Sequence, residues 1–362
     1  MTNKLIPFYP LAMLISMTLK CGGFSIKKLP LYFLFILRYI LLEPFRLLEI
    51  LLYHKKIEKQ QLDQGPIFIL GHWRSGTSHL QNLLNKDPNS TTTSLYGLLL
   101  ADNSMLTEFW LKPILNFSLK ILNVNYTLQR TQMDLNIVGE LDSGLCSSSS
   151  FYGYTWAHIF PRRFREIMDH LVFDIEPDVS QYWLNDLDFQ IKKLSYRNKN
   201  RQVIVKSPGD TARVRLLLQK YPKAKFIYID RDPYEVFRST QYLWSVIQKQ
   251  NSFQIISKDD IDQAIIETYK KLILAYRDQK DLVPTNQLIE ISMTDLQRSP
   301  LECLKLVYGR LELGPLPINE LKEYLDNIET YTPIEHSLSS EQKELLKREW
   351  DFAFEDSPRD SL

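Results

Sequence analysis

Short apolar runs alternate with amphipathic segments along much of the chain. Runs at 66–70 (PIFIL), 203–206 (VIVK), 224–230 (AKFIYID) and 287–292 (QLIEIS) are bounded by turn residues or polar segments, and each predicts a buried strand. Helical periodicity follows three of them, in TSHLQNLLNK, TARVRLLLQKY and PYEVFRSTQYLW. Strands that alternate with helices predict βαβ units and a parallel sheet covered on both faces.

The segment from about residue 97 to residue 200 shows no clear strand pattern. It has helical periodicity and clusters of aromatic residues, so we expect helical insertions around an acceptor pocket. The predicted fold class is therefore α/β, a parallel sheet flanked by helices and carrying helical insertions. We place the main domain at residues 61–355 and an apolar and amphipathic helical segment at residues 1–60.

Two apolar stretches occupy the N-terminal segment. Residues 5–19 are too few to span a bilayer, which requires roughly 20 apolar residues. Residues 29–53 are interrupted by Arg38, Glu43, Pro44, Arg46 and Glu49, which argues against a spanning helix. Two alternatives remain, a helix packed on the main domain and an amphipathic element on a membrane surface. The leucine and aromatic content of LYFLFILRYILL slightly favours peripheral membrane contact through residues 5–53.

Composition limits the possible partners. The formal net charge of +1 gives no reason to expect nucleic acid, so any anion site must be local. Cys21, Cys146 and Cys303 lie far apart and form no C-x-x-C pair, which favours a reducing compartment such as the cytoplasm over a disulfide scaffold. The six histidines form no metal-binding array, and we predict no metal.

The loop between the first predicted strand and its helix, GHWRSGTSHL, has the features of an anion site. Gly71 and Gly76 permit a tight turn, and the amides of residues 75–78 then point into one small volume at a helix N-terminus. Against the phosphate-loop pattern G-x-x-x-x-G-K-[ST], Thr77 replaces the lysine that reaches the terminal phosphates, and Arg74 stands within the loop instead. This P-loop-like arrangement favours a nucleotide with one bridging phosphate and no Mg²⁺.

The string Arg74-Ser75-Gly76-Thr77-Ser78 resembles the 5′-phosphosulfate loop of sulfotransferases that use 3′-phosphoadenosine 5′-phosphosulfate (PAPS). The resemblance covers roughly residues 40–350 and is closest to bacterial members with a G-H-W-R-S-G-T loop. It implies that these five residues bind PAPS, the sulfuryl donor.

A second anion element follows the third predicted strand. Arg231 ends that strand and Ser239 lies eight residues further on, so the two can hold an anion from both sides of a turn. This spacing resembles the family's motif for the 3′-phosphate of PAPS. The alternative for Arg231 is a surface ion pair with Asp232 or Glu235.

Lys206 lies at the same expected sheet edge, at the end of the second strand. It resembles the family lysine of K-S-P, and we assign it, with Arg74, to stabilising the departing phosphate. Its alternative role is an ion pair with a nearby acid. The resemblance thus implies in-line transfer of a sulfuryl group from PAPS to an acceptor hydroxyl.

The general base has several candidates. Relatives often read K-S-P-P-H-T-A-R, and here Asp210 replaces the histidine; it is a base or the N-cap of a helix at Thr211. Glu140 and Asp142 belong to a stretch resembling an acidic segment of relatives. We rank Glu140 and Asp210 together, then Asp142, then His72.

The residues leave alternatives open for the acceptor and for the function. The aromatic run at 151–160 and the apolar N-terminus favour a lipid-like or other apolar alcohol, the alternative being that these aromatic residues are core. A P-loop kinase or nucleotide hydrolase is one rival, with residues 226–230 (FIYID) as its metal-binding strand. A catalytically silent, membrane-associated nucleotide-binding protein is another.

Overall fold

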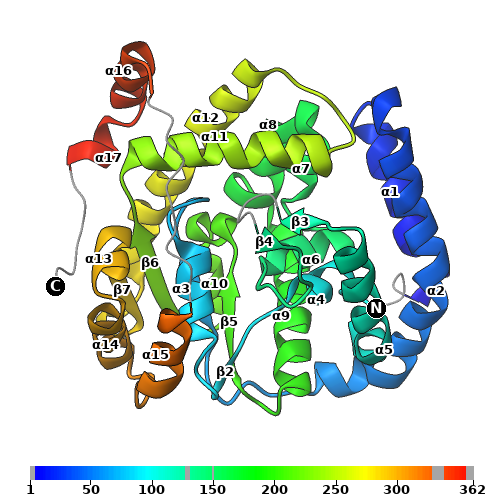
Figure 1. Cartoon of the computed structure of the whole chain (residues 1–362), viewed down its shortest axis with the longest axis horizontal. Coiled ribbons are helices and arrows are strands. Elements are labelled where there is room, and N and C mark those ends of the chain that lie inside the picture. Colours follow the sequence, from blue (N-terminus) through cyan, green and yellow to red (C-terminus); the bar gives the residue numbers. More distant parts are fainter. Residues whose placement is uncertain (1–4, 127–130, 149–150, 328–337, 356–362) are drawn as a thin grey trace. The chain divides into compact units, whose positions relative to one another are not determined.

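The computed structural model of the chain describes residues 5–126, 131–148, 151–327 and 338–355 (Figure 1). The chain forms two compact units. The helical unit consists of Met1–Gln61, Thr93–Lys199 and Leu243–Asp260, and the sheet unit of Leu62–Thr92, Asn200–Tyr242 and Ile261–Leu362. The limits expected from the sequence, 1–60 and 61–355, remain predictions.

Five strands within the described residues form the parallel sheet of the sheet unit, in the order β2-β5-β1-β6-β7. Their bounds are β1 Ile67–Leu70, β2 Ser90–Thr91, β5 Gln202–Lys206, β6 Lys225–Asp230 and β7 Leu288–Ser292. The order confirms the predicted parallel α/β fold. Strand β1 is central, and the chain continues from neighbouring strands to opposite sides of the sheet. The loop that follows β1 therefore lies at the carboxyl edge of the sheet, at the position where such folds usually bind ligands.

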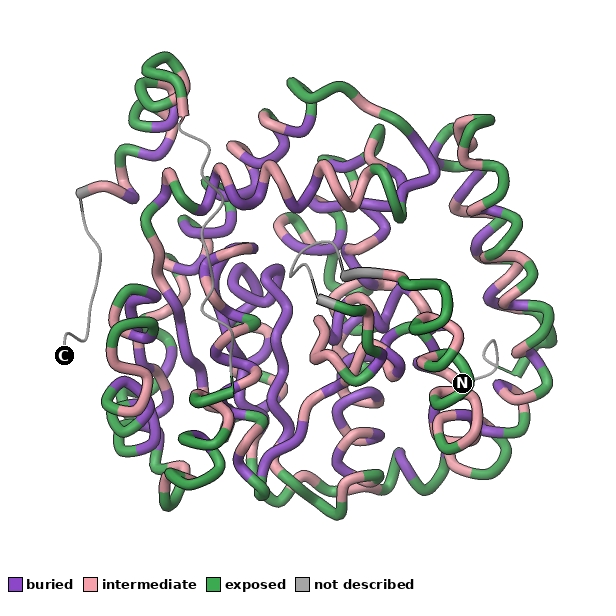
Figure 2. The backbone as a smooth tube through the Cα atoms, in the orientation of Figure 1, coloured by how far each residue is buried: buried purple, intermediate pink, exposed green. Residues whose placement is uncertain are grey.

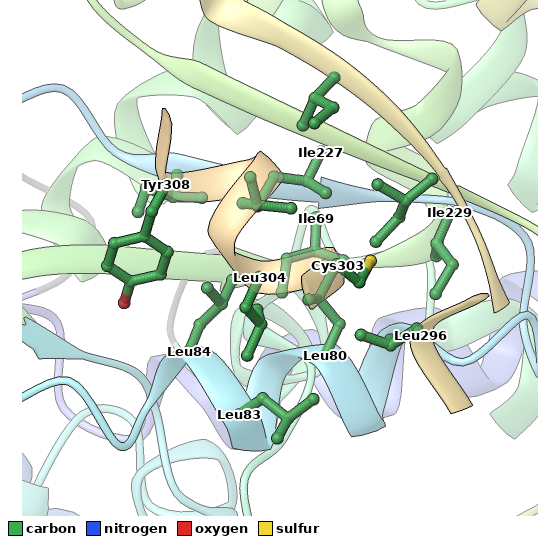
Figure 3. Packing of buried hydrophobic residues seen from close by; sticks show 14 of the residues in the cluster. Ile69, Leu80, Leu83, Leu84, Ile227, Ile229, Leu296, Cys303, Leu304 and Tyr308 are labelled. Carbon is green, nitrogen blue, oxygen red and sulfur yellow. The ribbon is translucent and has the colours of Figure 1, made fainter. Parts of the chain in front are cut away.

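Alternate residues along the strands face two different cores. One face is aliphatic: Ile69, Ile227 and Ile229 pack with Leu80 and Leu304 from the covering helices, as Figure 3 shows. The other face is aromatic, with Phe68 stacked on Phe226 and Tyr228 on Tyr276 at centroid distances of 5.6 and 4.0 Å. Both faces are thus buried, which explains why the three central strands β5, β1 and β6 have nearly continuous apolar sequences.

The helices of the sheet unit carry these cores. They are α3 Thr77–Leu84, η5 Pro208–Ala212, α10 Val214–Lys220, η6 Lys280–Leu282, η7 Thr285–Gln287, α13 Met293–Arg298, α14 Pro300–Leu311, α15 Ile318–Asp326, α16 Ser340–Glu349 and α17 Asp351–Glu355. Helices α11 Pro233–Gln250 and α12 Lys258–Gln279 each include residues of both units. One prediction is wrong in detail: the helix expected from Thr211 begins at Val214, after a short 3₁₀ turn.

The helical unit contains the segment for which helical insertions were expected, and that segment is largely helical. Its elements are α1 Tyr9–Lys20, η2 Ile26–Lys28, α2 Leu29–Glu58, α4 Leu95–Leu99, α5 Ser104–Ile121, β3 Asn125–Tyr126, β4 Thr131–Gln132, α6 Leu141–Ser147, α7 Trp156–Ile159, η3 Pro161–Arg163, α8 Phe164–Met168, η4 Asp169–Phe173 and α9 Pro177–Arg197. The small β3–β4 pair was not expected. None of the helices in the described ranges is long and apolar enough to cross a membrane.

Candidate functional site

The loop after β1 is a tight turn, and at two of its positions only glycine fits. Gly71 and Gly76 have φ values of +138° and +103°, and a Cβ on Gly76 would lie 2.1 Å from the Met293 Sδ. The side chain of Ser75 bonds to the His72 carbonyl within the loop. Gly71 N donates to the Thr211 Oγ1 at 2.8 Å, which ties the loop to the 3₁₀ turn after β5.

Helix α3 begins directly after this loop. Gly76 is its N-cap and supplies no side-chain hydrogen bond, so the amides of the first turn, which begins with Thr77 and Ser78, have no cap acceptor. Thr77 is buried and Ser78 is exposed. Open amides at a helix N-terminus, beside a cation such as Arg74, are the donor set that a phosphate or sulfate group needs. The residues present therefore fit an anionic ligand.

The two predicted anion elements meet in the sheet unit. Arg74 Nε donates to the Ser239 Oγ at 2.8 Å, and Arg231 Nη1 donates to the Arg74 carbonyl at 2.7 Å. Arg231 also forms the ion pair with Glu235, at 2.8 Å between Nη2 and Oε2. The ion pair predicted with Glu235 is therefore present beside the contact with the first loop, and binding of a 3′-phosphate by Arg231 stays a prediction. Arg74 adopts a left-handed backbone, φ +68°, which aims its carbonyl at Arg231.

Lys206 ends β5 beside the loop. It is aligned with Ile69 of β1, one residue before the end of that strand, and is 3% exposed. Asp210, also buried, lies in the 3₁₀ turn and pairs with Arg213 at 3.2 Å. The N-cap interpretation of Asp210 is wrong. The N-cap residue of α10 is Arg213, and no side chain caps that helix.

His72 is buried in the loop that follows β1. Its Nδ1 bonds to the Trp73 carbonyl at 2.9 Å, and its ring lies edge-on to Trp73 and Tyr269. Burial lowers the pKa of His72 to about 4, so the ring is neutral at physiological pH. Its Nε2 has no hydrogen-bond partner within the described part of the chain.

Glu140 and Asp142 belong to the helical unit, at the start of α6. Asp142 is 1% exposed and accepts from Tyr154 N at 2.7 Å and from Trp183 Nε1 at 3.4 Å. Glu140 is half-buried and accepts from the Tyr154 hydroxyl at 3.1 Å. Burial lowers the pKa of the nearby His158 to about 4, and the negative charge of Glu140 opposes that shift. Asp142 is therefore built into the core, whereas Glu140 is more accessible.

Sequence reasoning missed the two threonines that hold the loop. Thr211 bonds to both backbone groups of Gly71, and Thr240 donates to the Trp73 carbonyl at 3.2 Å. Thr211 directly follows Asp210 in the sequence, but the pattern there predicts a helix start and not a bond to the loop. Across the described ranges, no cluster of three or more His, Cys, Asp or Glu side chains could hold a metal ion.

The loop after β1 thus lies at the carboxyl edge of a parallel sheet, and its residues fit an anionic ligand. Residues 66–314, well over half of the chain, match the profile described as the Sulfotransferase family, and the chain belongs to that family.

Individual relatives are more distant. The chain is 27% identical over 303 residues to omega-hydroxy-beta-dihydromenaquinone-9 sulfotransferase Stf3 of Mycobacterium bovis and of Mycobacterium tuberculosis, covering 83% of this chain and 76% of each relative. The crystal structure of sulfotransferase STF1 from M. tuberculosis superposes with a TM-score of 0.69 at 14% identity, covering 94% of this chain and 90% of that one. STF9 from Mycobacterium avium gives 0.63 at 16% identity, over 84% and 80%. These structures share the fold.

Proposed function

We propose that the chain transfers a sulfuryl group from PAPS to the hydroxyl of a lipid-like alcohol. The observation that carries this proposal is the contact between the two anion elements: Arg74 bonds to Ser239, and Arg231 bonds to the Arg74 carbonyl. A donor with phosphate groups at both its 5′ and 3′ positions requires two such elements at a fixed separation. The family membership supports sulfuryl transfer as the reaction.

The residues of the sheet unit divide the work on the donor. The open first-turn amides of α3 and the side chains of residues 74–78 hold the 5′-phosphosulfate. Arg231 and Ser239 hold the 3′-phosphate. Lys206 and Arg74 stabilise the negative charge that grows on the phosphate oxygen as the bond from sulfur to that oxygen breaks.

The acceptor hydroxyl must lose its proton to a base. Asp210 and Asp142 are each 1% exposed; Asp210 forms an ion pair with Arg213, and Asp142 accepts two hydrogen bonds in the core. Glu140 is only half-buried, so its carboxylate is more accessible to an acceptor, and it accepts from the Tyr154 hydroxyl. We therefore propose Glu140 as the base, with Asp210 second, Asp142 third and His72 last, since a neutral imidazole with a pKa of about 4 is a weak proton acceptor.

The acceptor class rests on one relative and on the surface of the chain. Stf3 is named for a hydroxylated menaquinone, a lipid-like substrate. The N-terminal helices of this chain expose many aliphatic side chains. An acceptor with a long apolar portion suits both observations.

An acceptor panel tests this function. Purified full-length protein is incubated with PAPS and with hydroxylated prenyl quinones, long-chain alcohols, phenols or sugars, and sulfated products are identified by mass spectrometry. We expect product with the apolar alcohols, and its loss in Lys206→Met, which removes the charge while keeping a side chain of similar length. Sulfation of sugars alone would overturn the acceptor class, and the absence of any sulfated product would overturn the activity.

A further inference from the structure

Helix α2 has an inverted distribution of polarity. Its charged residues in the middle of the helix, Glu43, Arg46 and Glu49, are 3–4% exposed. Most of its leucines are exposed instead, among them Leu34 at 58% and Leu51 at 78%. Figure 2 shows the resulting alternation of buried and exposed positions along this helix. A helix that only packs on a protein would place its apolar face inward.

The inward charges are fully committed within the helical unit. Arg46 pairs with Glu43 at 2.6 Å, and Glu43 also accepts from Phe8 N at 2.7 Å. Glu49 contacts the ammonium of Lys193, and its other oxygen accepts from Met105 N at 2.8 Å. The orientation of α2 is therefore fixed by specific buried bonds, and the helix cannot turn its leucines inward without leaving these charges unpaired.

The outward face of α2 is long, continuous and aliphatic. Exposed apolar side chains recur along one side of the helix, with the exposed Pro44 between Leu41 and Leu48, and continue on α1, which packs against α2. We name this set the leucine face; its members on α2 are Phe33, Leu34, Leu37, Ile40, Leu41, Leu48, Leu51 and Leu52, and on α1 Ile15 and Leu19.

Basic residues stand at both ends of this face. Lys20 and Lys27 lie before α2, and Lys55, Lys56 and Lys59 lie at its end, all exposed. Residues 1–61 contain nine Lys or Arg and three Asp or Glu, although the whole chain has a net charge of only +1. The N-terminal segment is thus strongly basic, and its outward cations flank the aliphatic side chains.

We propose that the leucine face docks on the surface of an anionic lipid bilayer, with α2 lying in the plane of the membrane. Leucines at the level of the acyl chains and lysines at the headgroups are the composition of interfacial helices. Protein interfaces, by contrast, are enriched in aromatic residues and arginine and depleted of lysine. The charge pattern therefore favours lipid over a second copy of the chain as the occupant. This docking requires neither PAPS nor an acceptor.

Vesicle co-sedimentation of the full-length protein tests the proposal. We expect the protein to sediment with vesicles of phosphatidylcholine and phosphatidylglycerol, and more weakly with phosphatidylcholine alone. The triple variant Leu34→Asp/Leu41→Asp/Leu51→Asp should lose at least about 100-fold in partitioning, since each buried leucine contributes about tenfold. The control Leu306→Asp, at a leucine on α14 of the sheet unit that is 42% exposed, should bind as the wild type does.

A second variant covers misfolding of the first. Lys55→Gln/Lys56→Gln/Lys59→Gln should keep the melting temperature and weaken binding to anionic vesicles by about fivefold for each lysine. Wild-type protein that stays in the supernatant with anionic vesicles would overturn the proposal. So would equal binding by the triple leucine variant, or a dimer in solution that binds no vesicles and that the leucine variant dissociates.

Discussion

Replacing Arg231 with alanine should weaken binding of adenosine 3′,5′-bisphosphate much more than binding of 5′-AMP. The guanidinium has five N–H groups. Contacts with described residues use three of them: Nε and Nη2 bond to Glu235 at 2.9 and 2.8 Å, and Nη1 bonds to the Arg74 carbonyl at 2.7 Å. Two N–H groups remain for a 3′-phosphate.

The magnitude follows from those two donors. A hydrogen bond to a charged partner contributes about 1.5–3 kcal/mol, and the two bonds of one guanidinium are not additive. We therefore expect a loss of about 3 kcal/mol, a Kd about 100-fold higher, for the ligand that carries the 3′-phosphate. Isothermal titration calorimetry of both ligands, with wild type and Arg231→Ala, measures the difference directly.

Glu235→Gln is the matched control. Its carboxylate is 48% exposed, and ion pairs at such positions contribute less than about 1 kcal/mol. This variant should bind adenosine 3′,5′-bisphosphate as tightly as the wild type or slightly more tightly, because Arg231 keeps its charge and loses a competitor. Equal weakening of both ligands by Arg231→Ala would refute the reasoning, since Arg231 would then act by supporting the Arg74 loop.

Three further predictions concern stability and the base. Gly76→Ala places a Cβ 2.1 Å from Met293 Sδ at a φ of +103°, so thermal melts should show a loss of stability of about 1–3 kcal/mol. The control is Gly309→Ala on helix α14, where a Cβ meets open space; it should be neutral or stabilising by up to about 1 kcal/mol. Burial lowers the pKa of both His72 and His158 from 6.5 to about 4, so the unfolded chain binds protons first as the pH falls. The free energy of unfolding should therefore decline below pH 6.5, by about 2 kcal/mol per histidine at pH 5. Urea midpoints that do not change between pH 7 and pH 5 would contradict this. Asp142→Asn should lower the free energy of unfolding by about 1–3 kcal/mol, because it disturbs a buried acceptor of two N–H groups. Glu140→Gln should change stability by less than about 0.5 kcal/mol and should reduce turnover. The opposite pattern would exchange the roles of the two acids.

The sheet was predictable because its strands are buried on both faces. Their apolar runs stand between turn residues or polar segments, and away from the strand ends only Glu290 of β7 is charged, where it accepts from the Tyr276 hydroxyl. Strand β2 escaped prediction because it has two residues, Ser90 and Thr91, too few for any periodicity. The helix start at Thr211 was misassigned because the hydroxyl of Thr211 bonds to Gly71, a partner 140 residues away.

The orientation of α2 shows a similar limit. Its sequence separates the charged from the apolar positions, but periodicity alone does not say which face points inward. That choice depends on Lys193, which lies 144 residues from Glu49 in the chain and supplies the buried counter-charge. For the site, motif spacing singled out Arg74, Arg231 and Ser239, while the bond from Arg231 to the Arg74 carbonyl needed the folded loop.

The most direct test of sulfuryl transfer is a comparison of donors at one acceptor. Full-length protein is given a hydroxylated prenyl quinone with either PAPS in EDTA or ATP with Mg²⁺, and the mass of the product is measured. We predict a sulfated product from PAPS, with one adenosine 3′,5′-bisphosphate released for each molecule formed. A phosphorylated product that forms only from ATP and Mg²⁺ would contradict the assignment and make the chain a kinase.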